Sequence, residues 1–374
     1  MESRSIASSG PGPSFLGTLA LVFVAIAALF AIDTFLAKVE QSETAAQAAR
    51  LFREGQRLAQ EDRTADSIAR LRAALALSRD NPEYQLALAD ALYRANKLAD
   101  AEALLTAMLQ NDATYGGANL LMARVLAHQG KLEAAEFYHH MAIYGRWPQD
   151  AANRVRARFE LIDLLVKEGN RKALLAELLP LQDEAPADLE TRRRVAHLFL
   201  LAGSPGRAAD IFRQILRENR DDADAYAGLG EAEIARGNYR IAETNLEMTA
   251  RLKPGNEDIR RRLDLARQVL ALDPMLRGLG AAERYRRTRE LVELALNSVK
   301  PCAGAGFSGT LQTLTDEAGQ ALQRRVRSAQ QDEATEANLE LAERLWQARQ
   351  KECKQTTQPG EEPLALVLAK DSAK

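Results

Sequence analysis

The stretch ADAYAGLGEAEIARGNYRIAETNLEMTARLKPGN, residues 223–256, decides the fold of this chain of 374 residues. It contains two amphipathic segments, separated by a turn at Gly237 and closed by Pro254. Glycine accepts the left-handed backbone at a helix C-terminus, and proline stops the second helix. The stretch therefore predicts a helix–turn–helix unit of about 34 residues.

The same residue types return at a constant spacing along the chain. One series marks the turns, with a spacing of 34 residues after a first gap of 39: Gly130, Gly169, Gly203 and Gly237. A second series of small residues has the same phase and the same five-residue insertion: Ala101, Ala135, Ala208 and Ala242. Because one helix pair cannot bury its own apolar faces, such units must stack into a solenoid.

The residues around these positions resemble the tetratricopeptide repeat. The stretch 223–256 carries nearly the full signature: Tyr226, Leu229, Gly230, Gly237, Tyr239, Ala242, Leu246, Leu252 and Pro254. The frame predicts a solenoid over 48–256 with about six repeats, at 48–81, 82–115, 116–149, 155–188, 189–222 and 223–256. The resemblance implies an all-α, right-handed superhelical solenoid of helix-turn-helix repeats. We expect an N-terminal transmembrane helix before the solenoid and a C-terminal helical extension after it.

Residues 15–37 form an apolar segment long enough to cross a membrane, since Phe15 to Ile32 has no charge and about 20 residues suffice. A cleaved secretory signal is the alternative, but its apolar region is normally about 7–15 residues behind a positive tail. We expect a retained single-pass anchor in the cell (inner) membrane, with the lipid bilayer as its partner. Residues 1–14 are expected to be a disordered tail.

The side of the membrane on which the repeats lie stays open. Lys38, Arg50 and Arg53 come after the apolar segment and only Arg4 precedes it, which favours a cytoplasmic solenoid by the positive-inside rule. A short tail before one long apolar run is instead typical of a signal anchor that exports the downstream part of the chain. The periplasmic or exported side is favoured slightly.

Four further parts are predicted between and after the anchor and the repeats. Residues 38–47 are a linker to the first repeat. Residues 257–300 are expected to form capping helices, because a terminal repeat needs a polar outer face. Residues 301–354 are a helical segment that could form a coiled coil, and residues 355–374 are a disordered tail.

By resemblance to the family, positions 5, 9, 12 and 13 of each first helix line a concave groove that binds protein partners. In this chain the predicted groove residues are Leu86, Asp90, Tyr93, Arg94, Leu120, Arg124, His128, Phe159, Asp163, Lys167, Arg193 and His197. Since aromatic residues and Arg dominate binding hot spots, the predicted anchors are Tyr93, Arg94, Arg124 and Phe159. Asn is missing from position 9, so we expect no clamp for a C-terminal carboxylate.

No motif predicts catalysis, a cofactor or a metal site. The net charge of -2 argues against nucleic acid as a general partner. The run Gly304 to Gly309 spells G-x-G-x-x-G but has no preceding strand, so we interpret it as a linker rather than a dinucleotide site. No small-molecule substrate is inferred.

Two further features concern charge and cysteine. The arginines between Arg284 and Arg289 are interpreted as a solvated helix face, with a phosphate or lipid-headgroup patch as the alternative. Cys302 and Cys353 are the only cysteines and form no C-x-x-C pair. They are expected to form a disulfide if the repeats are exported, and to stay reduced in a cytoplasm.

The sequence therefore predicts a membrane-anchored scaffold that binds protein partners through its groove and performs no chemistry. An alternative is a regulatory accessory subunit of a membrane enzyme in cell-envelope polymer synthesis or envelope protein quality control. A third is an enzyme with an unrecognised C-terminal domain. The order of membrane helix and repeats is similar to the lipopolysaccharide assembly protein B type, but this chain lacks the four-cysteine metal module that ends that type.

Overall fold

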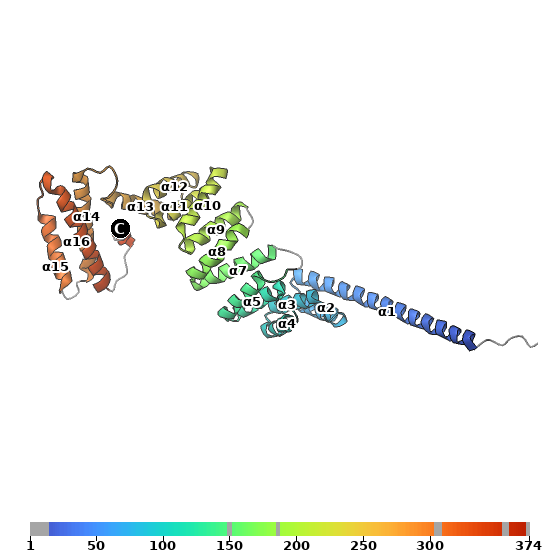
Figure 1. Ribbon diagram of the computed structural model, residues 1–374. Coiled ribbons are helices and arrows are strands. Elements are labelled where there is room, and N and C mark those ends of the chain that lie inside the picture. Colours follow the sequence, from blue (N-terminus) through green and yellow to red (C-terminus); the bar gives the residue numbers. More distant parts are fainter. Residues whose placement is uncertain (1–14, 148–151, 185–187, 303–308, 354–358, 372–374) are drawn as a thin grey trace, which may run out of the picture. The chain divides into compact units, whose positions relative to one another are not determined.

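The computed structural model describes residues 15–147, 152–184, 188–302, 309–353 and 359–371 (Figure 1). Regular structure in these ranges is helical, apart from one isolated bridge between Tyr115 and Arg146. The all-α prediction is thus confirmed. The chain divides into two compact units, residues 1–164 and 165–374.

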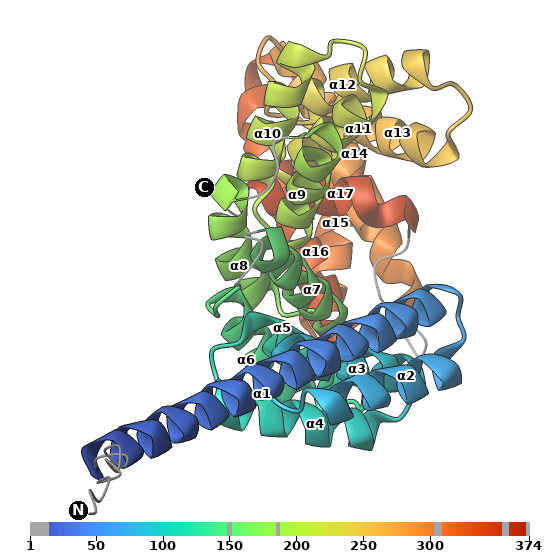
Figure 2. The same cartoon turned by 90° about the vertical axis from the view of Figure 1, so that its right-hand side faces the viewer.

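The first unit is a series of antiparallel helix pairs with a core of small and aliphatic side chains. Leu71, Leu105 and Val125, from three successive pairs, are fully buried or nearly so. Figure 2 shows the long first helix, which packs on the helix that follows it and extends beyond the pairs at its N-terminal end. The helices are α1 (Phe15–Gln60), α2 (Thr64–Leu77), α3 (Pro82–Arg94), α4 (Leu98–Asn111), α5 (Gly116–His128), α6 (Leu132–Ile143) and α7 (Ala152–Glu168), and the boundary of the unit falls within α7.

Helix α1 joins the apolar segment to the first repeat without a break. The linker expected at 38–47 is helical instead, because this segment contains neither Gly nor Pro and consists mostly of residues that tolerate a helix. Apolar side chains of α1 from Leu21 to Leu36 are exposed; Phe23, for example, is 75% exposed. This one apolar helix near the N-terminus fits either a membrane span or a signal sequence.

One turn recurs between the helices of the pairs. A residue with positive φ, between 57° and 77°, stands at six positions: Asp62, Asn96, Gly130, Gly169, Gly203 and Gly237. In each turn the next residue donates its N–H to a carbonyl five residues back, as from Lys131 to Leu126 at 2.9 Å. Asn and Asp are the non-glycine residues that best accept this conformation. The 34-residue spacing therefore continues through two turns where the sequence has no glycine.

Small residues mark where the two helices of a pair come closest. The predicted series Ala101, Ala135, Ala208 and Ala242 is fully buried. In the first repeat Ser67 takes this place, and its hydroxyl donates to the carbonyl of Gly55 at 2.8 Å. At Gly230 an added Cβ would come within 2.7 Å of Leu246, so the contact leaves no room for a larger side chain.

The second unit continues the pairs and then changes to longer helices. Its elements are α8 (Arg171–Glu184), α9 (Leu189–Leu201), α10 (Pro205–Glu218), α11 (Ala223–Ala235), α12 (Tyr239–Leu252), α13 (Glu257–Leu272), α14 (Ala281–Val299), η1 (Lys300–Cys302), α15 (Thr310–Gln323), η2 (Ser328–Gln330), α16 (Gln331–Glu352), η3 (Pro359–Glu361) and α17 (Glu362–Asp371). Helices α14 and α16 pack closely around Leu291, Ala295 and Leu345.

The disordered tail expected at 355–374 is wrong for its described part. Helix α17 packs on α13, α14 and α16, and its Leu364, Val367 and Leu368 are buried. These residues are spaced i, i+3, i+4, which gives a short helix one apolar face. Arg349, itself buried, fixes the start of this segment by donating to Glu361 at 2.5 Å.

Cys353 comes directly after α16, is buried, and is disulfide-bonded. Its pairing with Cys302 stays a prediction, because the side chain of Cys302 lies outside the described residues. The tail expected at 1–14 lies outside them as well.

Candidate protein-binding groove

A cavity of about 500 Å³ lies between α1, α3, α5 and α7 in the first unit, and we call it the groove cavity. Five of the predicted groove residues line it: Leu86, Asp90, Arg94, Leu120 and Arg124. Phe52 and Leu71 add further apolar surface. The lining of the cavity therefore combines apolar and charged side chains.

The charges of the groove cavity differ in how far they are already paired. Arg94 donates to Asp90 at 2.7 Å, and Arg124 holds Glu160 through two bonds of 2.8 and 2.6 Å. The bonds to Glu160 raise the pKa of Arg124. Arg156 is exposed and forms no ion pair within the described ranges. Arg156 is thus the cation of this cavity that is most available to a ligand.

The other predicted groove residues do not line the groove cavity. Tyr93 packs edge-on against His128, with ring centroids 5.9 Å apart, and Phe159 is half-buried on α7. Asp163 and Lys167 are exposed on α7. That these residues bind a partner stays a prediction.

In the second unit, the two predicted groove residues have partners of their own. Arg193 pairs with Asp222, whose side chain is buried, and His197 packs against Phe212 with centroids 5.1 Å apart. Burial lowers the pKa of His197, so its imidazole stays neutral at pH 7. Both residues of α9 thus contact neighbouring segments of the same unit rather than a free surface.

The sequence analysis missed one wall of the groove cavity. Phe52, Gln56, Ala59 and Gln60 of α1 line it, and they are positions 5, 9, 12 and 13 of the first repeat. The choice of positions 5, 9, 12 and 13, which gave Leu86 and Asp90 in the second repeat, would have given these four residues in the first repeat.

Trp147 is a second omission, and it borders another cavity of about 560 Å³ that we call the Trp147 pocket. Its loop is held by backbone bonds from Gly116 to the Arg146 carbonyl at 3.0 Å and from Arg146 to the Thr114 carbonyl at 2.7 Å. The indole Nε1 donates to the carbonyl of Ala142 at 2.9 Å. An added Cβ at Gly116 would overlap the indole ring, so glycine is required there. The five-residue insertion in the repeat spacing was the available signal for this loop.

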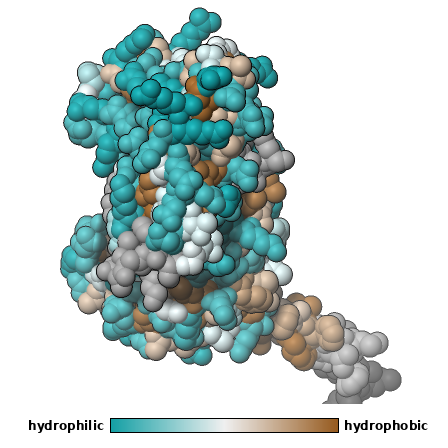
Figure 3. All heavy atoms as spheres, turned by 90° about the vertical axis from the view of Figure 1, so that its left-hand side faces the viewer, coloured by the Kyte–Doolittle hydropathy of each residue, from teal (hydrophilic) through white to brown (hydrophobic). Residues whose placement is uncertain are grey.

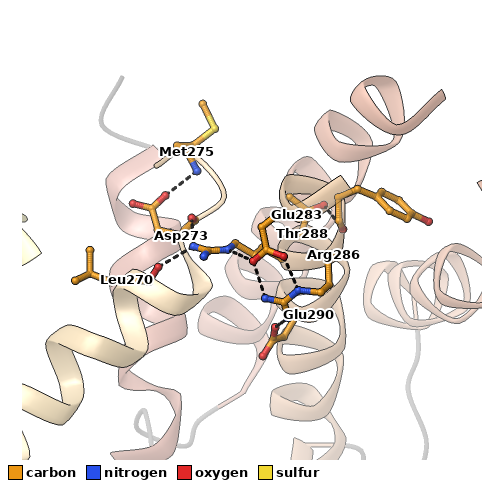
Figure 4. A network of polar contacts seen from close by, with 9 residues as sticks. Leu270, Asp273, Met275, Glu283, Arg286, Thr288 and Glu290 are labelled. Atoms are coloured by element: carbon orange, nitrogen blue, oxygen red, sulfur yellow. Dashed lines mark hydrogen bonds and ion pairs between the residues drawn. The ribbon is translucent and has the colours of Figure 1, made fainter. Parts of the chain in front are cut away.

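The arginines of α14 all have partners, and Figure 4 shows those of Arg286. Arg286 bonds Glu283 at 2.8 Å and Glu290 at 3.0 Å. The bonds that Glu283 accepts from Arg286 and Arg287 lower its pKa to about 2. Arg287 also donates to the carbonyls of Leu270 and Asp273 at the end of α13, at 2.7 and 2.9 Å.

The two remaining arginines of α14 also form hydrogen bonds to residues outside this helix. Arg284 reaches Asp332 at 2.9 Å, and Arg289 reaches the carbonyl of Leu322 at 2.5 Å. These side chains join α14 to its neighbours, which argues against a phosphate or headgroup patch.

Outside α1, the exposed large apolar side chains include Phe137, Tyr144 and Leu201. Figure 3 shows one face, on which hydrophilic side chains predominate and apolar ones gather where α1 emerges. Within the described ranges no group of three or more His, Cys, Asp and Glu side chains could hold a metal ion.

A tetratricopeptide repeat family model matches residues 58–114 and 199–263, about a third of the chain. Both segments are tetratricopeptide repeats. Proteins built of these repeats typically bind other proteins and perform no catalysis. No curated protein matches the chain by sequence.

Several solved tetratricopeptide repeat structures are similar to the chain. YrrB, described as a TPR protein with an unusual peptide-binding site, is 18% identical over 50% of this chain and 94% of its own, with a TM-score of 0.41. The C-terminal part of a TPR repeat-containing protein from Cytophaga hutchinsonii is 12% identical over 75% and 98%, with a TM-score of 0.44. The TPR2AB domain of yeast Sti1 in complex with pHSP90 is 13% identical over 81% and 98%, with a TM-score of 0.28.

Proposed function

We propose that this protein is a membrane-anchored scaffold that binds a protein partner through the groove cavity. The continuity of α1 carries the proposal, because one helix contains the apolar segment 15–37 and also supplies Phe52, Gln56 and Gln60 to the cavity wall. A helix rises 1.5 Å per residue, so about 20–35 Å of helix separates the apolar segment from that wall. The groove is then close enough to the bilayer to receive the extramembrane part of another membrane protein.

The lining of the groove cavity suits an extended peptide segment. Leu86 and Leu120 offer apolar contacts, Gln56 and Gln60 offer amides, and Arg156 offers an unpaired cation. Binding sites of this kind combine a mostly apolar surface with a few polar groups that fix orientation. We also place the repeats on the exported side, since the disulfide at Cys353 fits an oxidising compartment.

The test is retention of membrane partners by the full chain in detergent. Gln56, Arg94 and Arg156 are exposed, so changing all three to Ala should cost less than about 0.5 kcal/mol of folding stability each. We expect the triple variant to lose the partner while its helicity and thermal midpoint are unchanged. Arg124 is left intact, because its removal would leave Glu160 without its partner.

A matched control changes Arg53, Arg72 and Gln110 to Ala, which are exposed and do not line the cavity. This control should retain the partner. Equal retention by both variants would move the binding surface elsewhere on the chain.

A further inference from the structure

The Trp147 pocket adjoins the groove cavity and has a different charge. The two share Glu83, Leu86, Gly117, Trp147 and Asn153. The Trp147 pocket lies where α3, α5 and α7 begin and where α4 ends, with buried Met108 among its lining residues. A partner segment that lies along the groove would therefore meet this pocket beside it.

Carboxylates outnumber cations around the Trp147 pocket. Asp80, Glu83 and Asp112 line it, together with the single guanidinium of Arg146. Arg146 is already paired with Asp112, which also accepts from the Thr114 N–H and hydroxyl. Asp80 and Glu83 are exposed, and neither forms an ion pair with another described residue. Two negative charges without an ion-pair partner in the described residues are thus left in the lining of the pocket.

Two aromatic rings border the same space. Trp147 is fixed by its bond to Ala142 and by contact with Gly116, and Tyr115 is half-buried next to it in the lining. Burial, and next the charge of Glu83, raises the pKa of Tyr115, so this phenol stays neutral. A rigid indole face attracts a cation most strongly among the aromatic side chains, especially when carboxylates stand nearby.

We infer that the Trp147 pocket is the site in which an Arg or Lys side chain of the protein partner is held. The inference rests on the function proposed above and names the chemistry of the partner. The indole of Trp147 packs against the cationic head, and Asp80 and Glu83 pair with it. The aliphatic stem of the same side chain lies on Leu86 and Met108.

The experiment uses the full chain in detergent and an array of random decapeptides that are acetylated and amidated, so that every charge is in a side chain. We expect the retained peptides to contain Arg or Lys, and a change of that residue to Gln should weaken binding at least tenfold. The double variant Asp80→Asn, Glu83→Gln and the variant Trp147→Leu should show the same tenfold loss for the cationic peptide. Neither should weaken the Gln version of the peptide further.

The matched control is Glu133→Gln, an exposed carboxylate on α6 that does not line the pocket. It should bind like the unchanged protein. Retained peptides that keep their affinity after the Arg-to-Gln change, or in the double variant, overturn the inference and leave the groove function intact. An array on which the unchanged protein retains no peptide contradicts the groove function, and with it the inference.

Discussion

His139 stands at a position of α6 that the repeat pattern normally gives to a large apolar residue, and it is 3% exposed. Its Nδ1 has no hydrogen-bond partner among the residues that the structure describes. Burial lowers the pKa of His139 to about 4; Glu160 opposes this shift, and Arg124 and His140 add to it. The side chain is therefore neutral in the folded protein at pH values where the unfolded chain would bind a proton.

This difference predicts a pH-dependent stability. The unfolded pKa of about 6.5 exceeds the folded one, so the protein should lose stability as pH falls from about 6.5 to 4, by up to roughly 3 kcal/mol. His139→Leu should remove this part of the dependence, measured as the thermal midpoint at pH 7.5 and 4.5. The exposed His128→Gln is the control and should keep it. Parallel pH curves for the unchanged protein and His139→Leu would contradict the assignment.

The spacing of glycines and alanines was enough to predict the helix pairs, since the chemistry of a left-handed turn and of a close helix contact restricts residue type. The turns at Asp62 and Asn96 could not be distinguished in the same way, because these residues occur in many other conformations. Trp147 was missed because its place depends on backbone bonds to Thr114 and Gly116 from the preceding repeat. Helix α17 was missed because a helix of ten residues depends on the surface it packs against.

The contact between α10 and α11 restricts the size of the side chain at Gly228. An added Cβ at Gly228 would overlap the ring of Phe212, whereas Gly206 at the start of α10 has open space around it. Gly228→Ala should cost about 1–3 kcal/mol through overpacking. Gly206→Ala should be neutral or stabilise by up to about 1 kcal/mol, because alanine favours the helix. Thermal unfolding of the two variants tests this, and equal midpoints would contradict the packing described for α11.

For the molecule as a whole, the proposed anchor and the proposed exported side can be tested together. After an alkaline carbonate wash the full chain should stay in the membrane pellet, and a chain that lacks residues 1–37 should be released as a helical product. In the same membranes, Cys302 and Cys353 should resist alkylation until a reductant is added. Ready alkylation of both would place the repeats in the cytoplasm, and a mature chain that begins near residue 38 would identify a cleaved signal.

Because α1 is unbroken, the number of residues in 38–47 sets the direction in which the groove cavity faces around the axis of the anchor. Each residue of an α-helix turns the chain by about 100°. One residue added there would swing the groove cavity around the axis of the anchor and face it towards a different sector of the bilayer plane. Seven added residues would return it to nearly its first direction, about 10 Å further from the lipid. Among relatives that share the same membrane partner, insertions in this segment should therefore come in near-whole turns.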